Sequence, residues 1–338
     1  MNTTLLRICT ILITVFTILA MSGCTTTDNT EKPLVAATFF PYYDLAKAIA
    51  GEHANVYSVV PPTTEPHSFE PSPRDIMRLE RTSMYIATGV ELEQFEKVLL
   101  NAVQNTAIIV NGSAGIAFLA ADHHHHEDDR HDDEHHDEHE HDEHHEEDRH
   151  DDDEHHDEHE EDHHDHETGI DPHVWLSPIN AKVIAQNIYQ GFLQLDSEHA
   201  SSYEQNKQQL ISDLDTLDNA YRERLATCEK DVVLVAHNAY QYLAKEYGFK
   251  AISIAGLSHE SEPTPRQMAH LIDEAHEHGI NVVFFEELVD PRVAEAIAQE
   301  VGAETMALSP VEGSLDGKGY IQIMYDNLDK LAYALICS

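Results

Sequence analysis

The chain has 338 residues, of which 25% are charged, and a formal net charge of −43. The charge is uneven, because residues 122–167 hold 26 Asp or Glu, 18 His and 2 Arg and carry −24 by themselves. The remainder is also acidic and shows no basic patch interleaved with aromatic residues, which argues against nucleic acid as a partner.

The N-terminus predicts an exported lipoprotein. Residues 1–23 contain one positive charge, Arg7, and then an apolar stretch too short to span a bilayer comfortably, which is typical of a cleaved signal peptide. Residues 21–24, MSGC, resemble a lipobox, in which Cys24 is lipidated and becomes the first mature residue. The alternative is an ordinary signal with an incidental cysteine. We expect residues 24–32 to be a tether and the protein to be membrane-anchored on the extracytoplasmic face, at the cell surface or in the periplasm.

Strand and helix patterns alternate in the next part of the chain, which predicts an N-terminal α/β domain over residues 33–196. The 315 residues left after the signal are enough for two domains with sizeable cores. We expect strands at residues 34–40, 56–60, 84–89 and 107–110, and helices at residues 42–50, from 73, at 92–103 and from 178 to about 195.

Residues 122–167 interrupt this domain and contain no apolar residue, so we expect a disordered loop. Imidazole and carboxylate groups bind divalent transition metals, which predicts weak, multi-site metal capture. The auxiliary low-affinity ligands would include His123, His124, His125, His126, His163, His164 and His166. A solvated acidic spacer is the alternative, but it would not need 18 of the 27 histidines. A tight site is not expected, because an unfolded chain must lose conformational entropy to gather ligands.

A long helix and a second α/β series follow. Residues 199–227 lack Gly and Pro, and their apolar residues are spaced by three and four, which predicts an amphipathic helix of about 40 Å within residues 197–227. Residues 228–338 should form a C-terminal α/β domain. We expect strands at residues 231–236, 251–255, 281–285 and 305–308, and helices at 238–247, 265–278, 292–301 and 320–336.

Two cysteines remain once Cys9 is removed with the signal and Cys24 is lipidated. In an exported protein, Cys228 and Cys337 could form a disulfide between the start of the C-terminal domain and its last helix. Two buried free thiols are the alternative.

Three histidines stand in stiff, apolar settings unlike those of the acidic loop. His67 lies in a proline-braced turn after a predicted strand, and His173 lies between a proline and Trp175, the only tryptophan. His237 ends the apolar run at residues 232–236. Because α/β sheets place ligands at the carboxyl ends of their strands, we predict that these three histidines converge on one metal ion.

Four motifs carry a resemblance to a known family. They are EPHSFEPS at residues 65–72, DPHVWL at 171–176, HNAYQYLA at 237–244 and SPVEG at 309–313. In this order they resemble the zinc- and manganese-type substrate-binding lipoproteins of ABC transporters (cluster A-I), and the acidic loop is similar to that of the zinc branch. The resemblance implies two α/β domains joined by a single long rigid helix, with a metal cleft between them. It also implies a monomer that delivers its ion to an ABC permease driven by an ATPase.

By the same resemblance, His67 and His173 are ligands from the N-terminal domain and His237 is a ligand from the C-terminal domain. Residues 255–258 contain no carboxylate where the manganese branch has one, which favours a three-histidine site for Zn2+ over Mn2+. Glu312 is the first candidate for the fourth ligand, followed by water and then Glu65. Glu65 and Glu70 could instead orient imidazole rings.

The remaining histidines are interpreted as exposed: His53 and His199 at helix ends or loops, and His270, His276 and His278 on a surface helix. His259 is the exception, since it follows a strand end and could touch the metal or the loop. Glu286 and Glu287 also follow a strand but are interpreted as structural.

Other functions fit less well than transport. Three histidines and a water also make a catalytic zinc site, but the one His-Glu-x-x-His spacing, at residues 159–163, falls within the acidic loop, and no activated nucleophile pairing is present. A free-standing metal buffer would lack a transporter partner. We therefore expect the zinc-binding component of an importer and not an enzyme, with a manganese or other divalent-metal importer as the alternative.

Overall fold

The computed structural model describes residues 32–90, 94–120, 169–256 and 263–338. The predicted signal, the tether up to residue 31, the loop at residues 122–167 and His259 lie outside these ranges. The fold and the site belong to one compact unit, Leu34–Ser338. Among the described residues, no helix combines the length and the apolar character needed to cross a bilayer.

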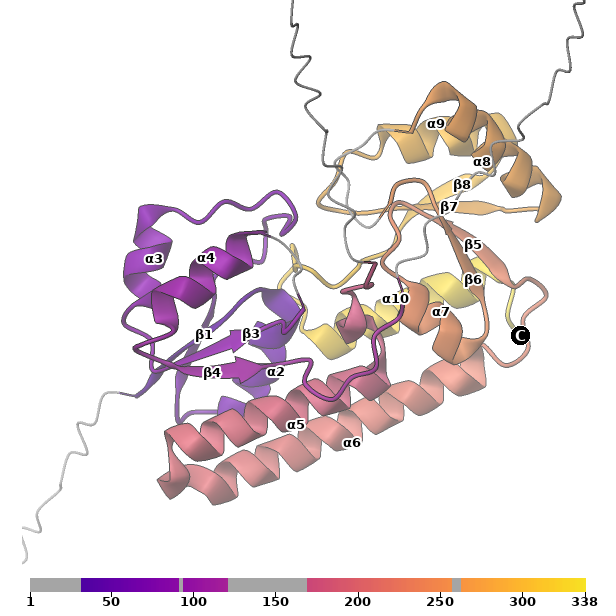
Figure 1. Cartoon of the computed structure of the whole chain (residues 1–338). Coiled ribbons are helices and arrows are strands. Elements are labelled where there is room, and N and C mark those ends of the chain that lie inside the picture. The colour runs from indigo at the N-terminus through magenta and orange to yellow at the C-terminus, as the bar shows by residue number, and fades with distance from the viewer. Residues whose placement is uncertain (1–31, 91–93, 121–168, 257–262) are drawn as a thin grey trace, which may run out of the picture. The chain divides into compact units, whose positions relative to one another are not determined.

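The first domain is built on a parallel sheet with the strand order β2-β1-β3-β4 (Figure 1). Its strands are β1 Leu34–Ala37, β2 Asn55–Ser58, β3 Met84–Ala87 and β4 Ile108–Asn111. Its helices are α2 Phe40–Ala50, α3 Pro73–Leu79, α4 Gln94–Val103 and α5 Pro178–Leu195. β3 is buried along its whole length, as expected for a parallel strand covered on both faces. α5 packs so closely on the sheet that a Cβ at Gly191 would lie 2.4 Å from Val110.

The second domain repeats this topology in a parallel sheet with the order β6-β5-β7-β8. Its strands are β5 Val232–Val235, β6 Lys250–Ser253, β7 Val282–Phe285 and β8 Glu304–Ala307. Its helices are α7 Gln241–Tyr247, α8 Pro265–Glu277, α9 Arg292–Val301 and α10 Tyr320–Ala334. Two parallel α/β domains are therefore confirmed. α7 begins three residues later than predicted, because residues 238–240 form the turn that leaves β5.

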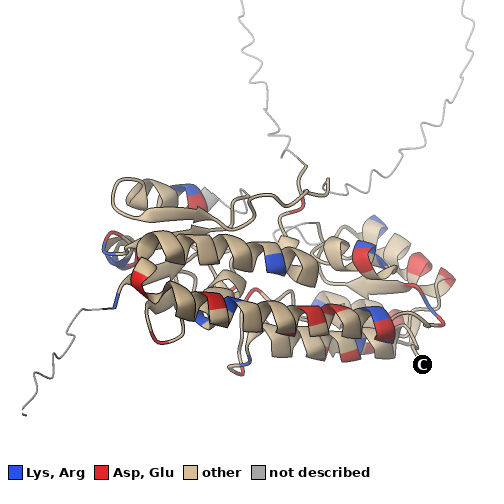
Figure 2. Ribbon diagram, turned by 90° about the horizontal axis from the view of Figure 1, so that it is seen from below, with Lys and Arg blue, Asp and Glu red and all other residues tan. Residues whose placement is uncertain are grey.

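The long helix between the two sheets is α6, Ala200–Arg224, preceded by the short 3-10 helix η2, Ser197–His199. Its 25 residues correspond to about 37 Å. The buried side includes Tyr203, Leu210, Leu214, Leu217 and Tyr221. α5 lies beside α6, and Figure 2 shows acidic and basic residues interspersed along this pair of helices, with all the acidic ones on α6.

The hydrophobic core is continuous between the two domains. One cluster joins the first sheet to α5, α6 and α10, and it also contains Val233 and Val235 from β5. Val232 and Leu234 belong to a separate cluster under α8 and α9, because successive side chains of a strand point to opposite faces. The second sheet therefore packs one face against elements shared with the first domain, which favours a firm connection between the domains.

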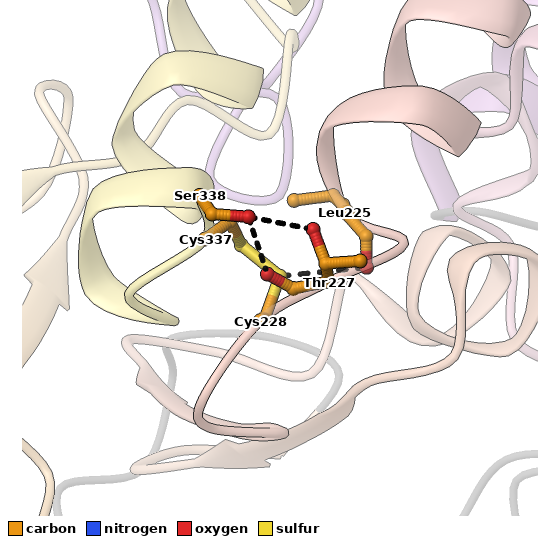
Figure 3. Close-up of a disulfide and its surroundings, with 5 residues drawn as sticks. All are labelled: Leu225, Thr227, Cys228, Cys337 and Ser338. Atoms are coloured by element: carbon orange, nitrogen blue, oxygen red, sulfur yellow. Dashed lines mark hydrogen bonds between the residues drawn. A yellow bond between two sulfur atoms is a disulfide. The ribbon is translucent and has the colours of Figure 1, made fainter.

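A disulfide joins Cys228 to Cys337 (Figure 3), so the alternative of two free thiols is wrong for this structure. The two cysteines also face each other in an isolated antiparallel bridge. Beside them the hydroxyls of Thr227 and Ser338 lie 2.8 Å apart. The C-terminal residue is thereby attached to the segment that leaves α6.

Candidate metal centre

Four buried side chains from separate segments meet at one point of the described structure. His67 lies in the loop after β2, and His173 immediately precedes the short 3-10 helix η1, Val174–Leu176. His237 follows β5, and Glu312 follows β8. One ligand atom of each lies within 4.8 Å of all the others. Three of the four, His67, His237 and Glu312, therefore follow the carboxyl ends of parallel strands, where α/β sheets place their ligands.

The donor atoms of these four side chains lie close to one another. Glu312 Oε1 lies 3.5 Å from His67 Nε2, 3.6 Å from His173 Nε2 and 3.9 Å from His237 Nε2. The Nε2 atoms of His173 and His237 are 3.2 Å apart. His67 is 8% exposed and the other three residues are 2% exposed or less, so water contributes little to their solvation. Within the described part of the chain, no donor makes a regular hydrogen bond to Glu312 Oε1.

Two further carboxylates orient two of the rings. Asp171 Oδ1 lies 2.8 Å from His173 Nδ1, and Glu286 Oε1 bonds to His237 Nδ1. A carboxylate only accepts, so each neutral ring carries its proton on Nδ1 and directs the lone pair of Nε2 inward. Two inward lone pairs 3.2 Å apart repel each other unless a cation lies between them. This arrangement fits a bound metal ion.

The pKa values of His173 and His237 are shifted in opposite directions. Burial lowers the pKa of His173, although Asp171 acts in the opposite direction. Burial would also lower the pKa of His237, but the carboxylates of Glu286 and Glu312 outweigh it and raise that pKa. For Glu312, burial would raise the pKa, but the contacts with His67 and the other two histidines lower it. Glu312 is therefore ionised near neutral pH.

The structure corrects two interpretations of acidic residues. Glu65 is not among the clustered ligand atoms, because its carboxylate accepts the backbone N–H groups of His67 and Ser68 at 3.0 and 2.8 Å. Glu65 therefore shapes the turn and does not orient an imidazole ring. Glu70 is exposed and likewise lies outside the cluster. Glu286, interpreted as structural, bonds instead to a ring of the cluster. The missed signal is that Glu286 directly follows a strand, β7, that pairs with the strand before His237.

The other described histidines lie outside the cluster. His53 and His199 stack on each other with ring centroids 4.0 Å apart, and His199 Nδ1 bonds to Asp196. His270 and His276 lie on α8 and are exposed, and His278 caps its end. None of these belongs to the group of four ligand atoms.

Replacing Glu286 by Gln should weaken zinc binding about 10- to 100-fold, because the neutral amide no longer supplies the negative charge that strengthens the bond to Nδ1–H and raises the basicity of the ring. Glu287→Gln is the matched control, since Glu287 is the adjacent residue and is exposed. Competition titrations with a zinc chelator would compare the two variants. Equal affinities for both variants and the wild type would contradict the orienting role of Glu286.

Comparisons with known proteins return relatives that are named for zinc uptake or zinc binding. The profile of a family described as "Zinc-uptake complex component A periplasmic" matches residues 35–334. The high-affinity zinc uptake system protein ZnuA of Bacillus subtilis is 34% identical over 312 residues, which cover 90% of this chain and 88% of that protein. The zinc-binding protein AdcA of Streptococcus pyogenes is 30% identical over 309 residues, which cover 89% of this chain but only 55% of AdcA.

The fold also has a close counterpart among solved structures. The crystal structure of the metal-dependent lipoprotein YcdH from Bacillus subtilis superimposes with a TM-score of 0.68 and 31% sequence identity. The match covers 90% of this chain and the whole of that structure. This similarity extends over both domains.

Proposed function

Because this chain belongs to the ZnuA family of zinc-uptake components, we propose that it is the extracytoplasmic zinc-binding component of a high-affinity zinc ABC importer. Zinc is the transported substrate, and His67, His173, His237 and Glu312 are its ligands. The observation that carries this proposal is the convergence of four buried donor atoms within 4.8 Å of one another, with two Nε2 atoms 3.2 Å apart. A cation bound among them would be in reach of all four donors.

The donor set favours zinc over manganese. Three imidazole nitrogens and one carboxylate suit a tetrahedral zinc ion, whereas manganese prefers more oxygen ligands. Four protein donors would also fill the coordination shell and leave no position for an activated water. This supports capture and release of the ion and not hydrolysis. The family is one of transport proteins, which points the same way.

The rest of the machinery is proposed from the sequence and the family. A signal at residues 1–23 would direct export, and Cys24 would carry the lipid anchor with residues 24–32 as its tether. The monomer would deliver zinc to an ABC permease and its ATPase. Residues 33–196 and 228–338 would be the two domains and residues 197–227 the connector. The name of the related YcdH protein, a metal-dependent lipoprotein, supports the anchor.

The acidic loop would bind zinc before the buried site does. Residues 122–167 concentrate cations through their charge of −24 and pass zinc to the buried site. Deleting them should lower the number of weakly bound ions and leave one tight zinc per chain. A competition titration on the soluble mature protein, with and without the loop, tests this. Loss of the tight zinc with the loop would show that the loop is the functional site.

Zinc affinity should fall as the pH drops, because only a neutral imidazole binds the ion. His237, with its raised pKa, takes up a proton at a higher pH than an ordinary histidine, so the loss begins above about pH 6.5. His173 keeps its lone pair to lower pH, because burial lowers its pKa. Each displaced proton weakens apparent binding about tenfold per pH unit. Titrations from pH 8 to pH 5 would measure the slope, and a flat profile would exclude histidine ligands.

A further inference from the structure

The segment that carries Glu312 is attached to both domains. It leaves β8 at Leu308, whose backbone N–H bonds to Phe285 O and whose carbonyl accepts from the Tyr240 hydroxyl, all within the second domain. Residues 309–319, here called the Glu312 segment, then run to the start of α10. Along this path the Glu312 segment contacts the first domain.

Two hydrogen bonds to the first domain flank Glu312. Trp175 Nε1 donates to Pro310 O at 2.8 Å, and Ser314 N donates to Pro62 O at 2.8 Å. One anchor thus lies two residues before Glu312 and the other two residues after it. The approach at the second anchor is so close that a Cβ on Gly313 would lie 2.3 Å from Pro62 O.

The backbone between these anchors is strained. Val311 has φ of 60° and is fully buried, although a β-branched side chain strongly disfavours this left-handed conformation. Such a residue keeps its conformation only where the surrounding structure imposes it. The anchors at Pro310 and Ser314 constrain it on either side, together with the bond from Val311 N–H to Ser309 Oγ at 3.1 Å. Glu312 directly follows this constrained residue.

Trp175, the donor of the first anchor, is itself firmly packed. Its side chain is fully buried, and its ring meets Phe39 edge-on with centroids 4.8 Å apart. Its carbonyl accepts the hydroxyl of Tyr320 at 2.5 Å. It also lies two residues after His173 in the chain. The same short segment therefore carries the ligand His173 and bonds to the backbone beside Glu312.

We propose that Trp175 is a positioning residue for zinc capture, which holds Glu312 against the three histidines through the bond from Nε1 to Pro310 O. This inference rests on the proposed function, in which Glu312 is a zinc ligand. Trp175 itself would not touch the ion. The part of its contribution that passes through the bond to Pro310 O should therefore be visible only while the carboxylate of Glu312 is present. The contact of its ring with the His173 ring, with centroids 5.2 Å apart, is common to both Glu312 backgrounds.

A double-mutant cycle tests this in the full chain, with Trp175→Phe, Glu312→Gln and the combined variant. Phenylalanine keeps an aromatic ring and removes the N–H group, so Trp175→Phe should weaken zinc binding about tenfold, the effect of one lost buried hydrogen bond. In the Glu312→Gln background the same change should cost less than about twofold. Tyr221→Phe is the matched control, because it also removes a buried bond to a backbone carbonyl, that of Met324 at 2.7 Å.

Competition titrations give the affinities, and circular dichroism with thermal unfolding reports folding. If Trp175→Phe does not fold, Tyr320→Phe replaces it, since this change removes the hydroxyl that bonds to Trp175 O. Equal losses in both Glu312 backgrounds, or no loss in either, would overturn the positioning role and leave the proposed function intact. An unchanged affinity in Glu312→Gln alone would instead remove Glu312 from the proposed ligands.

Discussion

Replacing His173 or His237 by alanine is expected to weaken zinc binding by at least about a hundredfold. Four-ligand zinc sites bind with about 10–16 kcal/mol, so one ligand of four corresponds to roughly 3 kcal/mol. Each of these rings is also held by a carboxylate, Glu286 for His237 and Asp171 for His173, so alanine removes a ligand that the fold has already oriented.

The measurement is a competition titration on protein lacking residues 122–167, so that the loop histidines do not compete for zinc. His276→Ala is the matched control, because His276 is exposed on α8 and lies outside the cluster. His67→Ala should also weaken binding. If any of the three histidine variants keeps the wild-type affinity, that residue is not a ligand and the four-ligand site is wrong.

Removing the disulfide should cost about 4 kcal/mol of unfolding free energy. Cys228 and Cys337 are separated by 109 positions, and the bridge closes a loop that contains the whole second sheet. In the chain-entropy account, a loop of about 100 residues corresponds to about 4–5 kcal/mol lost from the unfolded state. Urea unfolding of Cys228→Ser/Cys337→Ser, followed by circular dichroism, gives the difference.

A reducing agent provides the internal control for this experiment. Reduction should lower the urea midpoint of the wild type toward that of the double serine variant and leave the variant unchanged. A thiol count on denatured, unreduced soluble protein should find no free thiol at either position. Two free thiols there, or equal unfolding free energies, would contradict a bridge in the folded protein in solution.

The sequence by itself determined the class of fold and the three histidines that meet. Short apolar runs separated by amphipathic stretches predict parallel α/β domains, because each pattern reflects the local burial of one strand or helix. His67 and His237 follow predicted strands, and parallel strands deliver their carboxyl ends to one edge of a sheet. Glu312 could be ranked first among fourth ligands only through a family resemblance, since nothing local distinguishes it from Glu65.

Only the tertiary structure decided which distant groups support the site. His237 and Glu286 are 49 positions apart, and Trp175 and Pro310 are 135 positions apart. No local pattern encodes such pairs, because they depend on which strands become neighbours and how two domains pack. Glu65 is a local case, because its carboxylate bonds to the N–H groups two and three residues further along its own turn. Distant hydrogen-bond partners are determined by proximity in the folded chain, and this proximity cannot be derived from their separation in the sequence.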